Sequence, residues 1–206
     1  MYRALFSALA AFATAAVLAL PAAAQVTGRD VLRLISQELA NTTTLEAQFV
    51  QLNADGSRSD GVLSLHRPGR MRMAYSGDNA PLVIVGGSQI ALFDSPRKTS
   101  PEVYPLQRTP LWLVLQPNPQ LHNGEGVEKV WADESRYYVT TYDPNTPEAG
   151  RITFQFRAQP LALEGWVSQT SGGETVTVAL TSVRKGVDMG ASLFSATHEA
   201  NRRSQR

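Results

Sequence analysis

The most regular stretch of this sequence is Gly61-Val-Leu-Ser-Leu-His-Arg-Pro-Gly-Arg-Met-Arg-Met-Ala-Tyr75. Its apolar and polar side chains alternate on both sides of residues 67–69, which predicts two antiparallel strands joined by a turn. A three-residue loop places Leu65 opposite Met71, whereas a two-residue loop would place Leu65 opposite Arg72 and mix the faces. We therefore predict a three-residue loop and one continuous apolar face, made of Leu63, Leu65, Met71, Met73 and Tyr75.

Arg67 shares the parity of Leu63 and Leu65, so its guanidinium is expected at the rim of this apolar face. A charge in that position costs free energy unless it finds a hydrogen-bond partner. Taken alone, the pattern favours a side chain that extends to solvent and keeps the hairpin tip soluble. The alternative is a specific partner elsewhere in the chain.

The first residues have the composition of an export signal. Arg3 is followed by an apolar run over residues 4–20 and by Pro-Ala-Ala-Ala at residues 21–24, which predicts a signal peptide of residues 1–24 cleaved before Gln25. The run is short and weakly apolar for an uncleaved membrane anchor. Residues 25–206 show no repeat, linker or change of composition, so we expect a single domain.

Charge and cysteine content limit the function further. Removal of Arg3 with the signal peptide takes the formal charge from +1 to zero, which gives no electrostatic reason to bind nucleic acid. The absence of cysteine excludes disulfides, thiolate metal sites, a cysteine nucleophile and a lipid-modified N-terminal cysteine. We expect a protein that is free in the bacterial periplasm.

The remaining pattern predicts a helix followed by a mainly antiparallel sheet. Apolar residues at helical spacing over residues 30–40 indicate an amphipathic helix. From Leu45 onward the period falls to two, with Leu45, Ala47 and Phe49 on one side. Strand-like runs recur at residues 81–85, 90–93, 137–142, 151–156, 161–167 and 174–183.

One segment departs from the strand pattern. Thr109 and Pro110 suit the N-cap and first position of a helix, the apolar run of residues 111–115 follows, and the prolines of residues 116–119 end it. So short a helix with apolar residues on every side should be sandwiched, inserted in a groove or mobile. A plain core plug between strands fits the sequence equally well.

No enzymatic signature accompanies these elements. His66, His122 and His198 are the candidate general bases near neutral pH, and none lies in a nucleophile, zinc or phosphate-loop motif. Residues 122–125, His-Asn-Gly-Glu, follow a proline-rich loop and are better interpreted as a turn than as a metal site. We expect no catalytic residue, no metal and no cofactor.

Several blocks together resemble the LolA family of periplasmic outer-membrane lipoprotein carriers. They are Phe49 with Gln51, Leu-x-Leu-x-Arg-Pro-Gly at residues 63–69, residues 71–75, 83–85, 90–94 and 109–115, Leu-Glu-Gly-Trp at residues 163–166, Gly172, residues 175–178, and Val183 with Gly186. Their order and spacing cover nearly the whole chain after the signal peptide. The family pattern is less well matched after Met189, where the chain has Leu193-Phe194 and then a basic ending, residues 201–206, that we expect to be frayed or drawn to an acidic membrane surface or partner.

The resemblance implies an incomplete, strongly curved antiparallel β-barrel with an N-terminal helix and a short helical lid over its apolar concave face. It also implies a carrier that takes triacylated lipoproteins from an inner-membrane ATP-driven transporter to an outer-membrane acceptor. Each exposed methylene costs about 0.8 kcal/mol, so acyl chains cross water poorly without a shield. The carrier is expected to be a monomer.

The resemblance also assigns residues. Arg67 matches the family arginine that holds the lid shut, and by position its acceptors would be the backbone carbonyls of Val114 and Leu115. Acyl chains would contact the apolar face and the lid through Phe49, Leu63, Leu65, Met71, Met73, Tyr75, Leu111, Leu113 and Val114.

Two further functions stay open on the same scaffold. One is a sensor that binds lipid or stray lipoprotein and controls a membrane partner, although such a module normally has a second domain. The other is a carrier of a different lipid, such as a glycolipid or a terpenoid, because an apolar groove selects shape and length more than head group.

Overall fold

The computed structural model describes residues 27–78, 80–95 and 99–205 of the chain. The predicted signal peptide, residues 1–24, and its cleavage site before Gln25 lie outside these residues. The described helices are all too short or too polar to cross a membrane.

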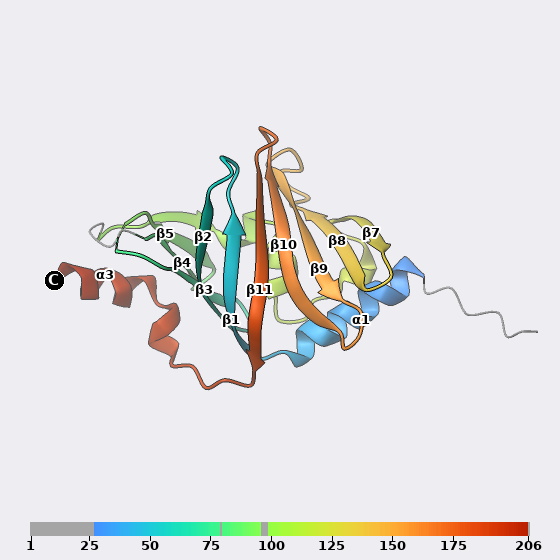
Figure 1. The fold of residues 1–206 in the computed structure, drawn as a ribbon, viewed down its shortest axis with the longest axis horizontal. Coiled ribbons are helices and arrows are strands. Elements are labelled where there is room, and N and C mark those ends of the chain that lie inside the picture. Colours follow the sequence, from blue (N-terminus) through green and yellow to red (C-terminus); the bar gives the residue numbers. More distant parts are fainter. Residues whose placement is uncertain (1–26, 79, 96–98, 206) are drawn as a thin grey trace, which may run out of the picture.

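Eleven antiparallel strands form one sheet in the order β6-β5-β4-β3-β2-β1-β11-β10-β9-β8-β7. The sheet is curved (Figure 1). It does not close into a barrel, because its two edge strands, β6 and β7, are not paired with each other. The strands are β1 Thr44–Leu52, β2 Arg58–His66, β3 Arg70–Tyr75, β4 Leu82–Gly86, β5 Gln89–Phe93, β6 Glu102–Pro105, β7 Val127–Ala132, β8 Arg136–Tyr142, β9 Gly150–Arg157, β10 Ala162–Thr170 and β11 Thr175–Lys185.

The hairpin of β2 and β3 has the register that the sequence predicts. Leu65 pairs with Met71 and Leu63 pairs with Met73, across a loop of residues 67–69. These side chains define the inner face of the sheet. The outer face carries a separate apolar cluster, which includes Leu82 and Ile84 of the neighbouring strand β4.

The sequential edge strands β6 and β7 lie at opposite ends of the sheet, so the chain between them has to cross from one edge to the other. This crossing segment contains the 3-10 turn η1 Leu106–Arg108, the short helix α2 Trp112–Leu115 and the 3-10 turn η2 Leu121–Asn123. Its apolar residues join the inner-face cluster. Topology therefore places the predicted lid over the inner face.

The N-terminal helix α1 Gly28–Asn41 confirms the predicted amphipathic helix. The Thr27 side chain accepts from the Asp30 backbone N–H and Asp30 reaches back to Thr27, which closes a capping box. The apolar stripe of α1, which includes Ile35 and Leu39, packs into the inner-face cluster.

The start of the lid helix differs from the prediction. Helix α2 has no side-chain cap, and the Thr109 hydroxyl donates instead to the Leu106 carbonyl at 2.8 Å. The Thr109 backbone N–H bonds to the same carbonyl. Thr109 therefore closes the preceding turn η1 and is not available as an N-cap for α2.

The basic C-terminal ending, expected to be frayed, is instead helical through residue 204. The turn η3 Ala191–Phe194 leads into helix α3 Ala196–Ser204, which packs Ala196 and Ala200 on the outer-face cluster. Figure 1 places α3 and α1 at opposite ends of the view. The expectation of a frayed end was wrong, because Arg202 and Arg203 form hydrogen bonds within the protein.

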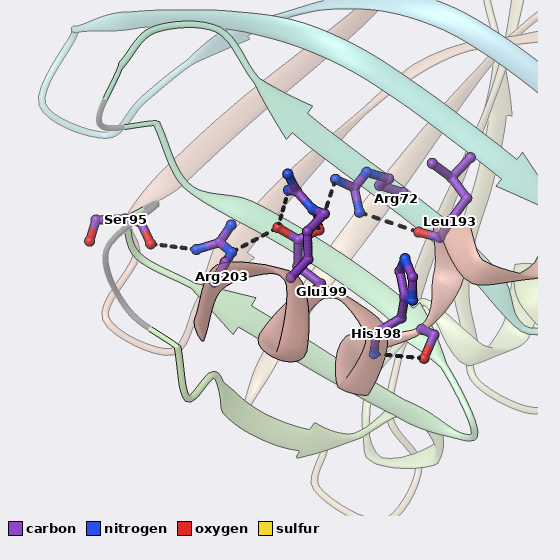
Figure 2. Close-up of polar contacts among 8 residues, drawn as sticks. Arg72, Ser95, Leu193, His198, Glu199 and Arg203 are labelled. Carbon is purple, nitrogen blue, oxygen red and sulfur yellow. Dashed lines mark hydrogen bonds and ion pairs between the residues drawn. The ribbon is translucent and has the colours of Figure 1, made fainter. Parts of the chain in front are cut away.

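These partners surround one buried carboxylate. Glu199 is 3% exposed and accepts hydrogen bonds from Arg202 and Arg203, and it lies 3.6 Å from a nitrogen of Arg72 in β3 (Figure 2). Arg203 also donates to the Ser95 carbonyl and stacks over the Phe93 ring, with its guanidinium carbon 4.3 Å from the ring centroid. The C-terminal helix is therefore held by charge as well as by apolar contact.

Candidate functional site

The inner face of the sheet carries the main apolar cluster of the described residues. Helix α1 covers one part of this face, and the crossing segment covers another. Side chains from both halves of the sheet contribute to it, from the β1–β3 half and from β9 and β10. A continuous apolar surface of this kind can remove apolar ligand surface from water.

A narrow cavity of about 40 Å³ lies between α2 and the sheet. A single water needs about 10–15 Å³ of such space, so this cavity admits a few water-sized groups and no acyl chain. Its walls are Leu39, Leu63, Leu65, Arg67, Met71, Leu111, Val114, Leu115, Phe154, Phe156, Leu163 and Trp166. Helix α2 therefore lies close over this part of the inner face and leaves no room there for an acyl chain.

The predicted acyl-contact residues all belong to or pack against the inner-face cluster. Only some of them line the cavity under α2. The cavity is lined by Leu63, Leu65, Met71, Leu111 and Val114. Met73 is buried in the same cluster outside the cavity wall. Leu113 lies on the other side of α2 and lines a separate surface hollow.

Phe49 and Tyr75 form an aromatic pair farther along the inner face. Their ring centroids lie 5.0 Å apart in an edge-to-face geometry. Phe49 also packs across the sheet on Gly61, where a Cβ would lie 2.8 Å from the ring and 2.1 Å from the Ala74 carbonyl oxygen. The Tyr75 hydroxyl donates to Gln51 at 2.7 Å, and burial raises the pKa of Tyr75. This end of the face is tightly packed.

Arg67 points into the closed site and not into solvent. Its residue is 6% exposed, it lines the cavity, and burial lowers its pKa to about 10, so the guanidinium stays charged at neutral pH. Its Nη2 donates to the Gln116 carbonyl at 2.9 Å. Among the described residues no partner is found for the buried Nη1.

The acceptor is not the one that the sequence predicts. The Leu115 carbonyl accepts instead from the Gly69 backbone N–H at 2.9 Å. Gln116 is the residue after the last helical position, and its carbonyl has no helical donor to accept from. Two hydrogen bonds from one loop, from Arg67 and Gly69, thus join the hairpin to the end of the lid.

Sequence reasoning missed the wall that faces the hairpin. Phe154 and Phe156 of β9 and Trp166 of β10 line the cavity, and their strands were predicted without a site role. The alternation of aromatic residues at 154 and 156 is a signal for one buried face. It does not say which other strands that face opposes.

The candidate general bases remain separate in the structure. His66 packs edge-to-face on Phe194 with centroids 5.9 Å apart, while His122 lies in η2 and His198 in α3. No group of three or more histidine, aspartate or glutamate side chains is placed to hold a metal ion within the described part of the chain.

Comparisons with solved structures return distant matches. A DUF1329 family protein from Desulfovibrio piger has 9% identity and a TM-score of 0.47, with 82% of this chain and 95% of that chain covered. A LolA superfamily protein from Nitrosomonas europaea has 7% identity and a TM-score of 0.43, with 80% and 97% covered. An uncharacterized conserved protein from Thermus thermophilus has 4% identity and a TM-score of 0.47, with 82% and 93% covered.

A search of curated proteins finds no match. The family model for outer membrane lipoprotein carrier protein LolA, in contrast, matches residues 40–197, which include every strand and the crossing segment. That match ends as α3 begins. The resemblance noted in the sequence is thus confirmed, and the chain belongs to the LolA family of outer membrane lipoprotein carrier proteins.

Proposed function

We propose that this protein carries the acyl chains of triacylated lipoproteins through the periplasm, from an inner-membrane ATP-driven transporter to an outer-membrane acceptor. Family membership supports the cargo class. The curved sheet supports the mechanism, because its inner face is apolar and extends over both halves of the molecule. Acyl chains held there would be removed from water, which is the main energetic obstacle to their transfer.

The observation that carries the proposal is a lid closed over a space too small for cargo. The cavity of about 40 Å³ cannot hold an acyl chain, so loading requires α2 to leave its place. The sheet has two free edges, and α2 belongs to a crossing segment that no strand pairing holds. Displacement of the lid would therefore open the inner face without unpairing the sheet.

Arg67 is proposed as the latch of this lid. It is a buried cation with one hydrogen bond to the chain that it holds and no bonded acid among the described residues. Such a hydrogen bond fixes the position of the closed lid. It adds little net stability to the closed state, because burial of the charge costs free energy. When cargo displaces the lid, the guanidinium can return to water.

Export is part of the proposal. Residues 1–24 would direct the chain to the periplasm and be removed before Gln25, and the domain of residues 25–206 would act as a monomer without metal or cofactor. The absence of cysteine leaves no site for N-terminal lipidation in this chain, which fits a shuttle that is not itself anchored.

The test is a charge in the groove. Leu65 is 8% exposed and lines the cavity, whereas Leu52 on the same sheet is 53% exposed. Leu65→Glu should weaken the binding of a triacylated lipopeptide by at least about 100-fold, since a carboxylate would be buried against acyl chains. Leu52→Glu should bind normally. Binding is measured by isothermal titration on protein whose folded fraction is checked by urea unfolding.

Leu163→Gln is a milder companion variant, because Leu163 lines the cavity and is only half-buried. It should reduce affinity while the protein remains folded. Normal lipopeptide binding by folded Leu65→Glu and Leu163→Gln proteins would reject the inner face as the acyl site. Binding without hand-over to any acceptor membrane would favour a sensor over a carrier.

A further inference from the structure

A second site lies on the opposite side of the lid from the apolar cavity. It is a surface hollow of about 440 Å³ between α2, η2 and the loop that follows β8. We call it the lid hollow. Its volume lies within the range of about 300–1,000 Å³ that is usual for small-molecule sites. The volume alone assigns no ligand.

Helix α2 separates the lid hollow from the apolar cavity. Leu111, Val114 and Leu115 line the cavity, whereas Trp112, Leu113 and Gln116 line the hollow. This alternation follows the helical repeat, which places residues three or four apart on one face. The two spaces are therefore neighbours across one helix that has to move for loading.

The chemistry of the lid hollow is that of uncharged hydrogen bonding. Side-chain amides dominate its wall, and they are Gln107, Gln116, Asn118, Gln120, Asn123 and Asn145. Its charged residues are the acids Glu125 and Asp143, and none of the described residues that line it is basic. Amides offer both donors and acceptors, which suit peptide groups, whereas carboxylates repel a phosphate.

The wall of the hollow is built by bonds within the protein. The Asp143 carboxylate is buried and accepts from the Thr146 hydroxyl at 2.7 Å and from the Asn145 backbone at 3.0 Å, and these bonds lower the pKa of Asp143. On the other side, the Leu121 backbone N–H donates to the buried Ser36 hydroxyl of α1 at 3.1 Å. The hollow is thus fixed on both sides of the movable lid.

We propose that the walls of the lid hollow on either side of α2 bind the first peptide groups after the acylated cysteine of the cargo, while α2 is displaced and the acyl chains occupy the inner face. This inference rests on the proposed function and names the place of the polar part of the same ligand. The N-acylated cysteine has no free amine, and its amide groups match a wall rich in side-chain amides. A lipid with a phosphate head group matches the acidic wall poorly.

Gln116 connects the hollow to the latch. Its side chain lines the hollow and its backbone carbonyl accepts from Arg67. The side-chain amide nitrogen of Gln116 also donates to the Leu113 carbonyl at 3.1 Å. A peptide that hydrogen-bonds to this side chain would act on the residue that Arg67 holds. Occupation of the hollow and release of the latch would then be coupled.

The experiment compares two ligands that differ only in the peptide. One is a triacylated cysteine that carries a short uncharged peptide, and the other is the same triacylated cysteine ending in an amide. The test protein is Gln107→Leu with Asn118→Leu, two exposed positions in the hollow, and the control is Gln48→Leu, an exposed glutamine of β1 outside it. Affinities are measured by isothermal titration on the full mature chain.

The wild type should bind the peptide-bearing ligand about 10-fold more tightly than the truncated one, because one or two hydrogen bonds of ordinary strength give that ratio. The double variant should lose this preference and keep its affinity for the truncated ligand. Gln48→Leu should behave as the wild type.

Equal affinity of the wild type for both ligands would overturn the inference and leave the acyl-carrier function standing. Equal loss for both ligands in the double variant would also overturn it, since the residues would then act on the lid. The double variant is also tested with phosphatidylglycerol vesicles and with a neutral glycolipid. If it loses more affinity for either of these than for the lipopeptide, the hollow binds another head group. A wild type that binds neither triacylated ligand would reject the carrier function itself.

Discussion

Helices α2 and α3 each cover apolar surface, and they are held in opposite ways. Helix α2 covers the inner face, has no side-chain cap, and is held at its end by bonds from Arg67 and Gly69. Helix α3 covers the outer face, has a Ser195 cap that accepts from His198, and buries Glu199 among arginines (Figure 2). One cover is suited to release and the other to permanent attachment.

The difference lies in how each buried charge is compensated. Arg67 has one bonded carbonyl and a buried nitrogen without a partner among the described residues, so its burial is only partly offset. Burial alone would raise the pKa of Glu199, but bonds from Arg202 and Arg203 hold it at about 2. A charge with full hydrogen bonding in a protein interior resists separation, because each partner would be left unpaired.

The largest effect is expected from removal of the charge that holds α3. Glu199→Gln removes the buried carboxylate to which both Arg202 and Arg203 donate, and breaking such a buried pair costs about 3–5 kcal/mol. The free energy of unfolding in urea should fall by about this amount at neutral pH. Glu134→Gln, in an exposed turn, is the control and should change little. Unchanged stability of the Glu199 variant would mean that α3 is held by apolar contact alone.

Acid should release α3 before it affects the lid. The pKa of Glu199 is lowered from 4.5 to about 2, so its stabilisation is complete above pH 4.5 and is lost as the pH falls toward 2. The expected loss is roughly 3 kcal/mol, at about 1.4 kcal/mol for each pKa unit. Arg67 stays charged throughout this range because its pKa is about 10. NMR signals of α3 backbone amides should shift in this window, whereas the signal of the Arg67 guanidinium should not. Simultaneous loss of both helices would contradict the contrast.

The smallest effect on stability is expected from removal of the latch. Arg67→Leu loses one charge-assisted hydrogen bond but also removes a buried charge, so the closed lid should weaken by only about 1.5 kcal/mol. Cargo that binds the open form should then be held about 10-fold more tightly, and hand-over to an acceptor should slow. Lipopeptide affinity and transfer rate are measured on the same preparation.

Arg58→Leu provides a matched control, since Arg58 is exposed at the start of β2. Its affinity and transfer rate should equal those of the wild type. Wild-type retention and normal hand-over by Arg67→Leu would mean that the guanidinium does not hold the lid, and that cargo release is driven elsewhere.

Local periodicity was sufficient for the elements that a chain builds from neighbouring residues. The alternation from Gly61 to Tyr75 predicted the hairpin register, and the apolar spacing of residues 30–40 predicted α1. Both depend on side-chain direction along one element, which the sequence contains directly. The edge strands β6 and β7 were not predicted, because their residues are largely exposed and lack a clear apolar alternation.

The chain by itself therefore determined an apolar sheet face, an amphipathic helix, a short apolar segment and a cation near them, and its motif order identified the family. Only the tertiary structure decided that Phe154 and Trp166 face the hairpin, that Arg67 bonds to Gln116, and that the C-terminal arginines surround Glu199. These contacts join residues far apart in the sequence. Their partners are set by sheet order and by the path of the crossing segment between two edges, which no local period encodes.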